Sequence, residues 1–100
     1  MSFVTSDKML ADAQRGRYAV GAFNVENMEM VKAVIAAAEE AQAPVMLQTT
    51  PSTVRYGSLE TFVAMVRAEA DKTEIPVCLH LDHGDSFELA IQAIKAGYTS

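Results

Sequence analysis

Cysteine is nearly absent from this 100-residue chain: Cys78 is the only one, so no disulfide can form within it. No apolar run approaches the roughly 20 residues that a membrane-spanning helix requires. The first residues also lack the basic start and the apolar stretch of a secretory signal peptide. Together these absences favour a protein of the reducing cytoplasm.

Positive charge is scarce as well. Eight Lys and Arg residues stand against 13 Asp and Glu residues, and the formal net charge is -5. This balance argues against nucleic acid and against anionic membrane surfaces as partners, because both attract basic proteins. Half of the residues are hydrophobic, which is typical of a globular chain and not of a disordered one. A chain of this length forms one domain at most.

A short apolar run, a polar loop and a segment of helical periodicity follow one another three times. The apolar runs cover residues 18–24, 45–48 and 77–81. Because these runs are unbroken, they predict parallel strands that are covered on both faces. Apolar residues spaced i, i+3, i+4 and i+7 predict the helices that follow, around residues 31–38, 59–66 and 87–94.

The predicted helices carry signals at their ends. A leading helix is predicted over residues 7–15, with Ser6 as its cap. Asp85 is expected to cap the last helix, with Glu88 as its capping-box partner. Gly97 follows that helix, where a left-handed residue is favoured. Arg55 and Tyr56 are expected in a long surface loop after the second strand.

This order of elements fits two parallel α/β architectures, a (β/α)8 barrel and an open doubly wound sheet. No G-x-G-x-x-G or phosphate-loop motif follows the first strand, which disfavours a nucleotide-binding doubly wound sheet. A barrel needs about 250 residues, and residues 99–100 lie where a fourth strand should begin. We therefore expect residues 1–100 to be the N-terminal part of a longer protein.

One face of the predicted strands collects the polar groups. Side chains alternate between the two faces of a strand, and the odd-numbered residues of 77–81 form an apolar face suited to helices. The polar residues share a single parity within each strand and lie at its C-terminal end: they are Asn24, Gln48, Thr50, His80 and Asp82. Parallel α/β proteins build active sites at that end. The alternative is that polar residues merely mark strand ends near water.

Two imidazoles and a carboxylate lie within the segment Leu79-His80-Leu81-Asp82-His83-Gly84. Histidine is the commonest metal ligand, and Asp can act as an acid or a base. Gly84 is expected to permit the sharp turn that carries His83 to the cavity. A catalytic zinc usually takes three protein ligands, so further ligands would come from later strands. From spacing alone, a hydrogen-bonded interior His80, a solvated His83 and a turn or cap role for Asp82 remain open.

At this segment the sequence resembles a known family. Residues 77–84 closely resemble the H-x-D-H signature of class II fructose- and tagatose-bisphosphate aldolases. Residues 16–24 resemble that family's first strand, residues 43–48 its second strand, and residues 93–100 the end of its third helix. The resemblance covers essentially the whole chain, with its motifs in the family's order.

The resemblance implies a (β/α)8 barrel, of which these residues supply a leading helix and the first three strand–helix units. It implies reversible cleavage of a ketose 1,6-bisphosphate into dihydroxyacetone phosphate and glyceraldehyde 3-phosphate. Position by position, it implies that Asp82 is the catalytic acid/base and that His83 is a ligand of one Zn2+ ion, with the other ligands beyond residue 100. It implies that Asn24, Gln48 and Thr50 line the substrate cavity. We also expect a homo-oligomer, a dimer or a tetramer.

The sugar and the function class keep alternatives. Residues 50–53 resemble tagatose-type enzymes, whereas Gly84 after His83 resembles fructose-type ones. One alternative is a non-catalytic partial barrel that acts by packing its open sheet edge against another chain. Another is a different metal-dependent barrel enzyme, such as a hydrolase, although the first strand has no histidine to begin an amidohydrolase-type H-x-H motif.

Overall fold

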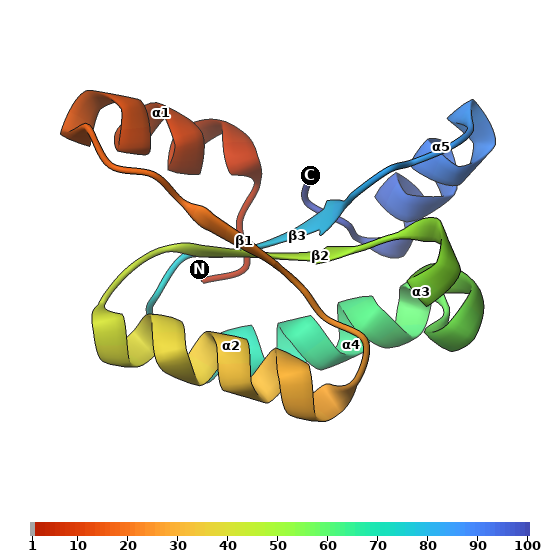
Figure 1. Ribbon diagram of the computed structural model, residues 1–100, viewed down its shortest axis with the longest axis horizontal. Helices are drawn as coiled ribbons and strands as arrows, with labels where there is room; N and C mark the ends of the chain where they lie inside the picture. Colours follow the sequence, from red (N-terminus) through yellow and green to blue (C-terminus); the bar gives the residue numbers. More distant parts are fainter. Residues whose placement is uncertain (1) are drawn as a thin grey trace.

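The computed structural model describes residues 2–100, which place helices on both sides of a small parallel sheet. In chain order the elements are α1 (Ser6–Gly16), β1 (Gly21–Asn24), α2 (Met28–Ala41), β2 (Val45–Thr49), α3 (Pro51–Gly57), α4 (Leu59–Ala70), β3 (Val77–Leu81) and α5 (Phe87–Ala96). The strands are parallel and lie in the order β1-β2-β3 (Figure 1). The predicted strand–helix repeat is therefore confirmed, and the third strand has the predicted bounds.

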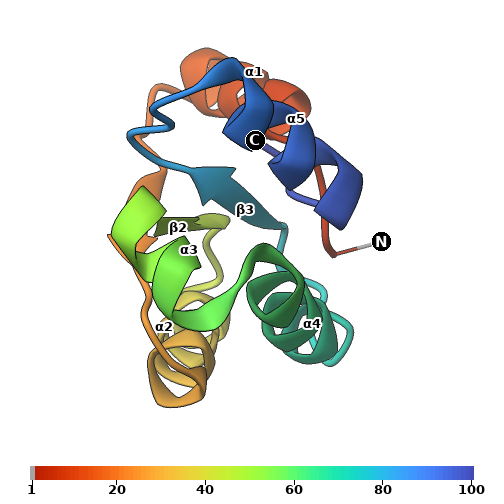
Figure 2. The same ribbon diagram turned by 90° about the vertical axis from the view of Figure 1, so that its right-hand side faces the viewer.

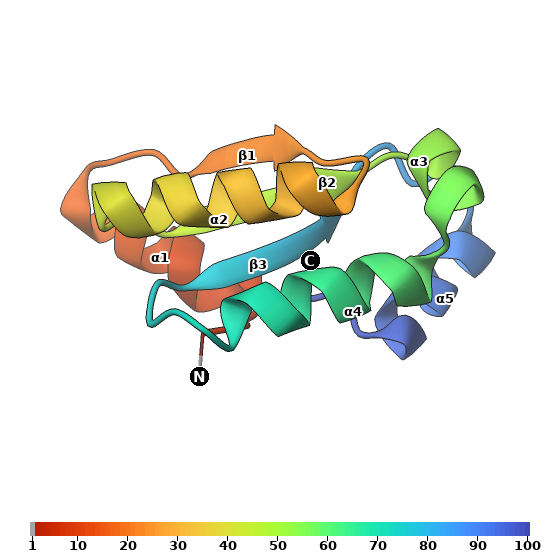
Figure 3. The same cartoon turned by 90° about the horizontal axis from the view of Figure 1, so that it is seen from below.

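One face of the sheet holds the main apolar core. The odd-numbered side chains of β2 and β3 point to this face; Leu47 and Leu79 are fully buried in the same core as residues of α2 and α4, and Leu81 is partly buried. These two helices lie side by side along this face (Figure 3). Because burying a leucine side chain is worth about 1.5–3 kcal/mol, this face contributes much of the free energy of folding.

The opposite face is covered at one end only. Met46 and Cys78, each the second residue of its strand, pack there against Met9 of α1. Figure 2 shows α1 across the sheet from α2 and α4. Since α1 covers the first residues of the strands, the C-terminal ends on this face are left to the polar residues.

Strand β1 is far more exposed than its two neighbours. All four of its residues are exposed, and Phe23 keeps 51% of its surface. The prediction of cover on both faces is therefore wrong for this strand. Within residues 2–100 no strand pairs with its outer edge, and the helix that follows it, α2, packs mainly against α4 and β2.

Two helix starts differ from the prediction. Ser86, and not Asp85, caps α5, because its side chain accepts the Leu89 backbone N–H at 3.1 Å. Thr5 occupies the cap position of α1, so Ser6 is the first helical residue. At the other end of α5, Gly97 adopts the predicted left-handed conformation with φ 118°. No helix within residues 2–100 is long and apolar enough to cross a membrane.

The segment after β2 is a helix and not the expected loop. Arg55 and Tyr56 lie in α3, where both are exposed. Pro51 stands in the first turn, where its missing N–H costs nothing, and Thr50 caps the helix. Helix α3 lies at the C-terminal end of the strands (Figure 3), so it partly covers this end of the sheet.

The outer edge of β3 is shared by the two ends of the chain. The Val4 N–H donates to the Val77 carbonyl and the Val77 N–H to the Ser2 carbonyl. Further along, the Ser100 N–H donates to the Leu79 carbonyl, and the Leu81 N–H donates to the Ser100 carbonyl. This pattern of hydrogen bonds is that of a parallel strand pair. Ser100 therefore lies beside β3 in the position that a fourth parallel strand would take.

Candidate active site

The sheet register aligns three of the predicted polar residues. Asn24 pairs with Gln48, and Gln48 pairs with His80, at the C-terminal ends of the three strands. The Gln48 Nε2 donates to Asn24 Oδ1 at 2.6 Å and to Asp82 Oδ2 at 3.2 Å. One amide thus connects side chains from β1 and from the turn after β3, so Asn24, Gln48 and Asp82 form one cluster.

Asp82 is fixed at its backbone and accessible at its carboxylate. Its N–H donates to the Thr49 carbonyl at 2.9 Å, which extends the pairing of β2 with β3 by one step. Its side chain keeps 28% of its surface. An anchored backbone with a partly exposed carboxylate suits a group that exchanges a proton with a bound substrate.

His83 turns away from the strand through its own backbone. Its φ is 54°, in the left-handed region, which costs a non-glycine residue about 1–2 kcal/mol. The expectation that Gly84 makes this turn is wrong, because Gly84 does not have a positive φ. The turn brings the His83 Nε2 to 3.7 Å from Asp82 Oδ2 and leaves the His83 side chain 78% exposed. The imidazole and the carboxylate therefore face the same open space.

His80 has a partner of its own. Its Nδ1 lies 3.0 Å from the Ser100 Oγ, and the side chain is half-buried beside the edge of β3. This is the hydrogen-bonded histidine that the sequence left as one alternative. His80 therefore lies beside Gln48 in the row of polar residues at the strand ends, but its hydrogen bond is to Ser100 and not to Asp82 or His83.

Thr50 lies at the same end of the sheet but in a separate cluster. Its Oγ1 accepts the Thr53 N–H at 3.5 Å and lies 3.1 Å from the Ser52 Oγ and 3.2 Å from the Thr53 Oγ1. The Thr53 hydroxyl in turn donates to Glu26 Oε1 at 3.4 Å. Sequence reasoning missed Glu26, although it shares the parity of Asn24 and stands two residues after it.

The residues present suit part of a metal site. Across residues 2–100, no three His, Cys, Asp or Glu side chains lie close enough together to hold a metal ion. His83 offers an exposed imidazole, which is a good zinc ligand. Cys78 does not offer a thiolate, because burial raises the pKa of its thiol. Among residues 2–100, His83 could therefore serve as one ligand of a metal ion, but these residues alone do not make a complete site.

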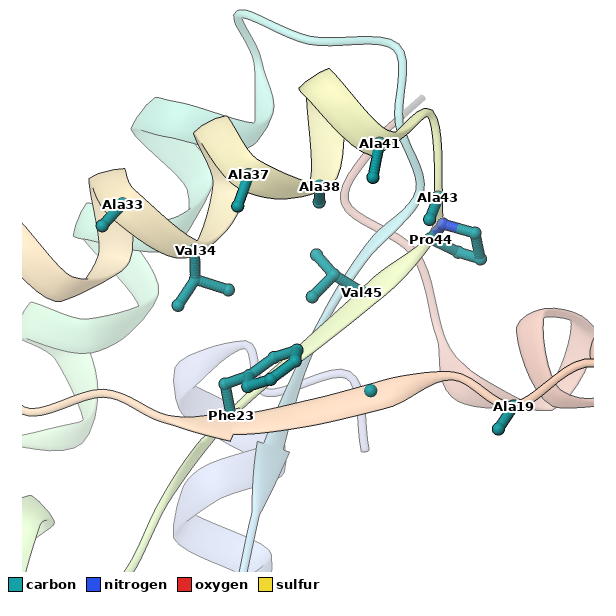
Figure 4. A pocket seen from close by; sticks show the side chains of 11 residues that line it. Ala19, Phe23, Ala33, Val34, Ala37, Ala38, Ala41, Ala43, Pro44 and Val45 are labelled. Carbon is teal, nitrogen blue, oxygen red and sulfur yellow. The ribbon is translucent and has the colours of Figure 1, made fainter.

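An apolar cleft of about 430 Å3 lies elsewhere, between β1 and α2 (Figure 4). Its lining is apolar and includes Phe23, Val34, Val45 and a series of alanines of α2. No titratable side chain lines it, so it offers nothing for acid–base or metal chemistry. The polar cluster around Asp82, and not this cleft, is the candidate active site.

Comparison with known proteins shows which family the chain belongs to. The sequence model of the family described as fructose-bisphosphate aldolase class-II matches residues 4–100. A fructose-bisphosphate aldolase of Geobacillus stearothermophilus is 48% identical over the whole chain, which covers 36% of that protein. A 6-phospho-5-dehydro-2-deoxy-D-gluconate aldolase of Bacillus velezensis is 45% identical, again over the whole chain and 36% of the relative.

A solved structure confirms the expected fold class. The YdjI aldolase from Escherichia coli K12 superposes with a TM-score of 0.86 and 38% identity, over 96% of this chain and 37% of that one. The leading helix and the three parallel strand–helix units thus have the same arrangement as in a solved aldolase structure. The chain spans about a third of the length of the relatives that it matches.

Proposed function

The chain belongs to the class II fructose-bisphosphate aldolase family, and on that premise we propose that the full-length protein reversibly cleaves a ketose 1,6-bisphosphate into dihydroxyacetone phosphate and glyceraldehyde 3-phosphate. One observation carries the proposal. Asp82 and His83 face the same open space at the C-terminal ends of the strands, 3.7 Å apart, and Gln48 ties Asp82 to Asn24. A carboxylate beside an exposed imidazole provides a proton-transfer group next to a metal ligand.

The roles follow from the bond that is broken. Cleavage between C3 and C4 leaves negative charge on the three-carbon ketone, and a divalent metal supplies the Lewis-acid stabilisation for that charge. The C4 hydroxyl loses its proton as the aldehyde forms, and it regains one in the reverse reaction. Asp82 is the acid/base for this transfer. Asn24, Gln48 and Thr50 hold substrate hydroxyl groups in the cavity.

We propose Zn2+ as the metal and His83 as its ligand from this chain. The exposed Nε2 of His83 and the proximity of Asp82 support this role. The remaining ligands come from beyond residue 100, since residues 2–100 hold no group of three candidate ligands.

We further propose that residues 1–100 are the N-terminal part of a single (β/α)8 domain. Both sheet edges support this proposal: β1 has no outer neighbour within the described chain, and residues 99–100 already run beside β3. Such a domain closes the sheet and covers the apolar cleft between β1 and α2. A homo-oligomer in the cytoplasm remains the expected form of the whole protein.

The relatives support a second substrate class. The Bacillus velezensis protein, 45% identical, is named for a sugar acid with one phosphate, on carbon 6 next to a keto group at carbon 5. Fructose 1,6-bisphosphate and tagatose 1,6-bisphosphate contain the same phosphorylated ketone. They differ from the sugar acid in the half of the molecule that becomes the aldehyde. We therefore expect the ketone half to be common to all three candidates and the aldehyde half to decide the substrate.

The test is a cleavage assay of the full-length protein with fructose 1,6-bisphosphate, tagatose 1,6-bisphosphate and 6-phospho-5-dehydro-2-deoxy-D-gluconate. We expect dihydroxyacetone phosphate to be released from at least one substrate, a chelator to abolish the activity, and Zn2+ to restore it. His83→Ala should lose bound zinc and activity together, which metal analysis and the same assay measure. Release of product from none of the three, or undiminished activity in His83→Ala, contradicts the proposal.

A further inference from the structure

Ser100 holds the end of β3 at three points. Its backbone N–H donates to the Leu79 carbonyl at 3.0 Å, and its carbonyl accepts the Leu81 N–H at 3.1 Å. Its Oγ lies 3.0 Å from the Nδ1 of His80. Three successive residues of β3 are thus bound to one residue of the neighbouring segment, and the last of them directly precedes Asp82.

His80 suits a role in holding the strand better than a role in binding a metal ion. Its Nδ1 is already engaged by Ser100, and the side chain is half-buried. Within residues 2–100 no three candidate ligands lie together that could include it. The side-chain bond between His80 and Ser100 therefore adds to the backbone bonds that fix this edge of β3.

The turn that follows β3 depends on such support. His83 adopts a φ of 54°, which an isolated chain disfavours for any residue other than glycine. A disfavoured backbone conformation persists where the surrounding structure holds the segment in place. Here the residues before the turn are held from both sides, because the Asp82 N–H donates to the Thr49 carbonyl of β2 and Ser100 binds the other edge.

We infer that His80 and Ser100 are positioning residues that keep the His83 turn in the conformation in which its imidazole can bind the metal ion. This inference rests on the proposed function, in which His83 is a ligand of Zn2+. Without the side-chain bond, the end of β3 spends part of its time in other conformations, and only the remaining fraction binds metal. The apparent Kd for zinc then rises in inverse proportion to that fraction.

The size of the effect follows from the loss of one hydrogen bond, which changes such an equilibrium by roughly three- to tenfold. The change should fall on the affinity for zinc. Once zinc is bound, the metal itself holds the His83 imidazole, so kcat at saturating zinc should equal that of the wild type. This separation distinguishes a positioning residue from a catalytic one.

The experiment measures the Kd for Zn2+ of the full-length protein by competition with a chromogenic chelator, and kcat for sugar cleavage at saturating zinc. Two variants distinguish the ring nitrogens of His80. His80→Asn carries its amide on Cγ, as Nδ1 is carried, whereas His80→Gln places its amide one carbon further out, near the position of Nε2. We expect His80→Gln to raise Kd roughly three- to tenfold and His80→Asn to stay close to the wild type. Equal shifts in both variants, or a normal Kd in His80→Gln, overturn the inference.

Ser100→Ala removes the other partner of the bond. It deletes one exposed hydroxyl, so it tests the inference even if a variant of His80 fails to fold. It should raise Kd by the same factor as His80→Gln, and the double variant should add nothing further. An unchanged Kd in Ser100→Ala, or a shift that adds to that of His80→Gln, shows that the bond is not responsible.

Tyr98→Phe is the matched control. It also removes one hydroxyl with a hydrogen-bonded partner, two residues before Ser100, but that partner is Thr49 and not His80. It should leave the Kd for zinc unchanged; a shift as large as that of Ser100→Ala means that a general loss of stability is responsible and overturns the inference. If the wild type binds no zinc, the proposed function itself fails. A wild type that binds zinc and is active, with an unaltered Kd in Ser100→Ala, refutes only the positioning role.

Discussion

The two faces of β2 and β3 have different roles, although the same strands supply both. Odd-numbered side chains such as Leu47 and Leu79 are fully buried against α2 and α4. Even-numbered ones begin with Met46 and Cys78 under α1 and continue with polar groups at the open ends. Neighbouring residues of one strand therefore serve different purposes. Substitutions on the buried face should mainly lower the free energy of unfolding, and substitutions on the open face should mainly lower activity.

The largest effect should come from the open face. Asp82→Ala removes the proposed acid/base and should lower kcat about 100- to 10,000-fold. Zinc content and the free energy of unfolding should stay close to those of the wild type, since the carboxylate is partly exposed and His83 remains. Steady-state cleavage, metal analysis and denaturant unfolding of the full-length protein measure the three quantities. A large loss of stability would show that the two faces are not separable at this position.

The covered face should give the opposite result. Leu47→Ala deletes a side chain with no exposed surface and should lower the free energy of unfolding by about 2–5 kcal/mol. Denaturant titration of the full-length protein measures the loss. Leu10→Ala is a matched control on α1, where the leucine is 47% exposed, and it should cost clearly less. Equal losses in both variants would contradict the assignment of the core.

A polar pair inside the covered face offers a smaller test. The Tyr98 hydroxyl and the Thr49 Oγ1 lie 2.8 Å apart, both buried, and Tyr98→Phe leaves the Thr49 hydroxyl without this partner. The free energy of unfolding should fall by about 1–2 kcal/mol. Activity should not change, because neither hydroxyl reaches the open ends.

The same tyrosine gives a pH dependence. Burial raises the pKa of Tyr98 above its ordinary value of 10.0, although the hydrogen bond to Thr49 acts against this. The folded state thus holds the phenol proton more tightly than the unfolded state does. Its contribution to stability is complete below pH 10 and is lost as the pH rises above it. Unfolding measured from pH 8 upward should therefore decline less steeply in Tyr98→Phe, and an identical decline would contradict this.

The smallest effect should come from Gln48→Ala. Gln48 bridges Asn24 and Asp82, but its side chain is half-buried and water can replace its donor. Asp82 also keeps its backbone bond to Thr49. We expect kcat/KM to fall by less than about tenfold. A loss as large as that of Asp82→Ala would mean that the carboxylate depends on this amide for its position.

The sequence predicted the two faces because strand parity is a local property. Unbroken apolar runs identify β2 and β3, and alternation then assigns Gln48 and Asp82 to the same side. Prediction from the sequence failed for features that depend on contacts between segments distant in the chain. The exposure of β1 depends on which neighbours its edge has, and the link from Thr53 to Glu26 joins segments that are 27 residues apart.

Turns and caps were predicted less well for a different reason. Gly84 was the natural candidate for a left-handed turn, but His83 takes that conformation. Asp85 and Ser86 are both good cap residues, and only the position of the free Leu89 N–H selects Ser86. Such choices between adjacent residues depend on backbone angles that composition does not fix.

The pairing of Ser2 and Val4 with Val77 has a consequence for synthesis on the ribosome. The Ser2 hydroxyl also donates to the Thr73 carbonyl, 71 residues further along. At about 5–20 residues per second, Ser2 and Val4 therefore emerge roughly 4–14 s before their partners. During that time α1, β1 and β2 can form locally, while the leading segment stays unpaired and open to nascent-chain chaperones.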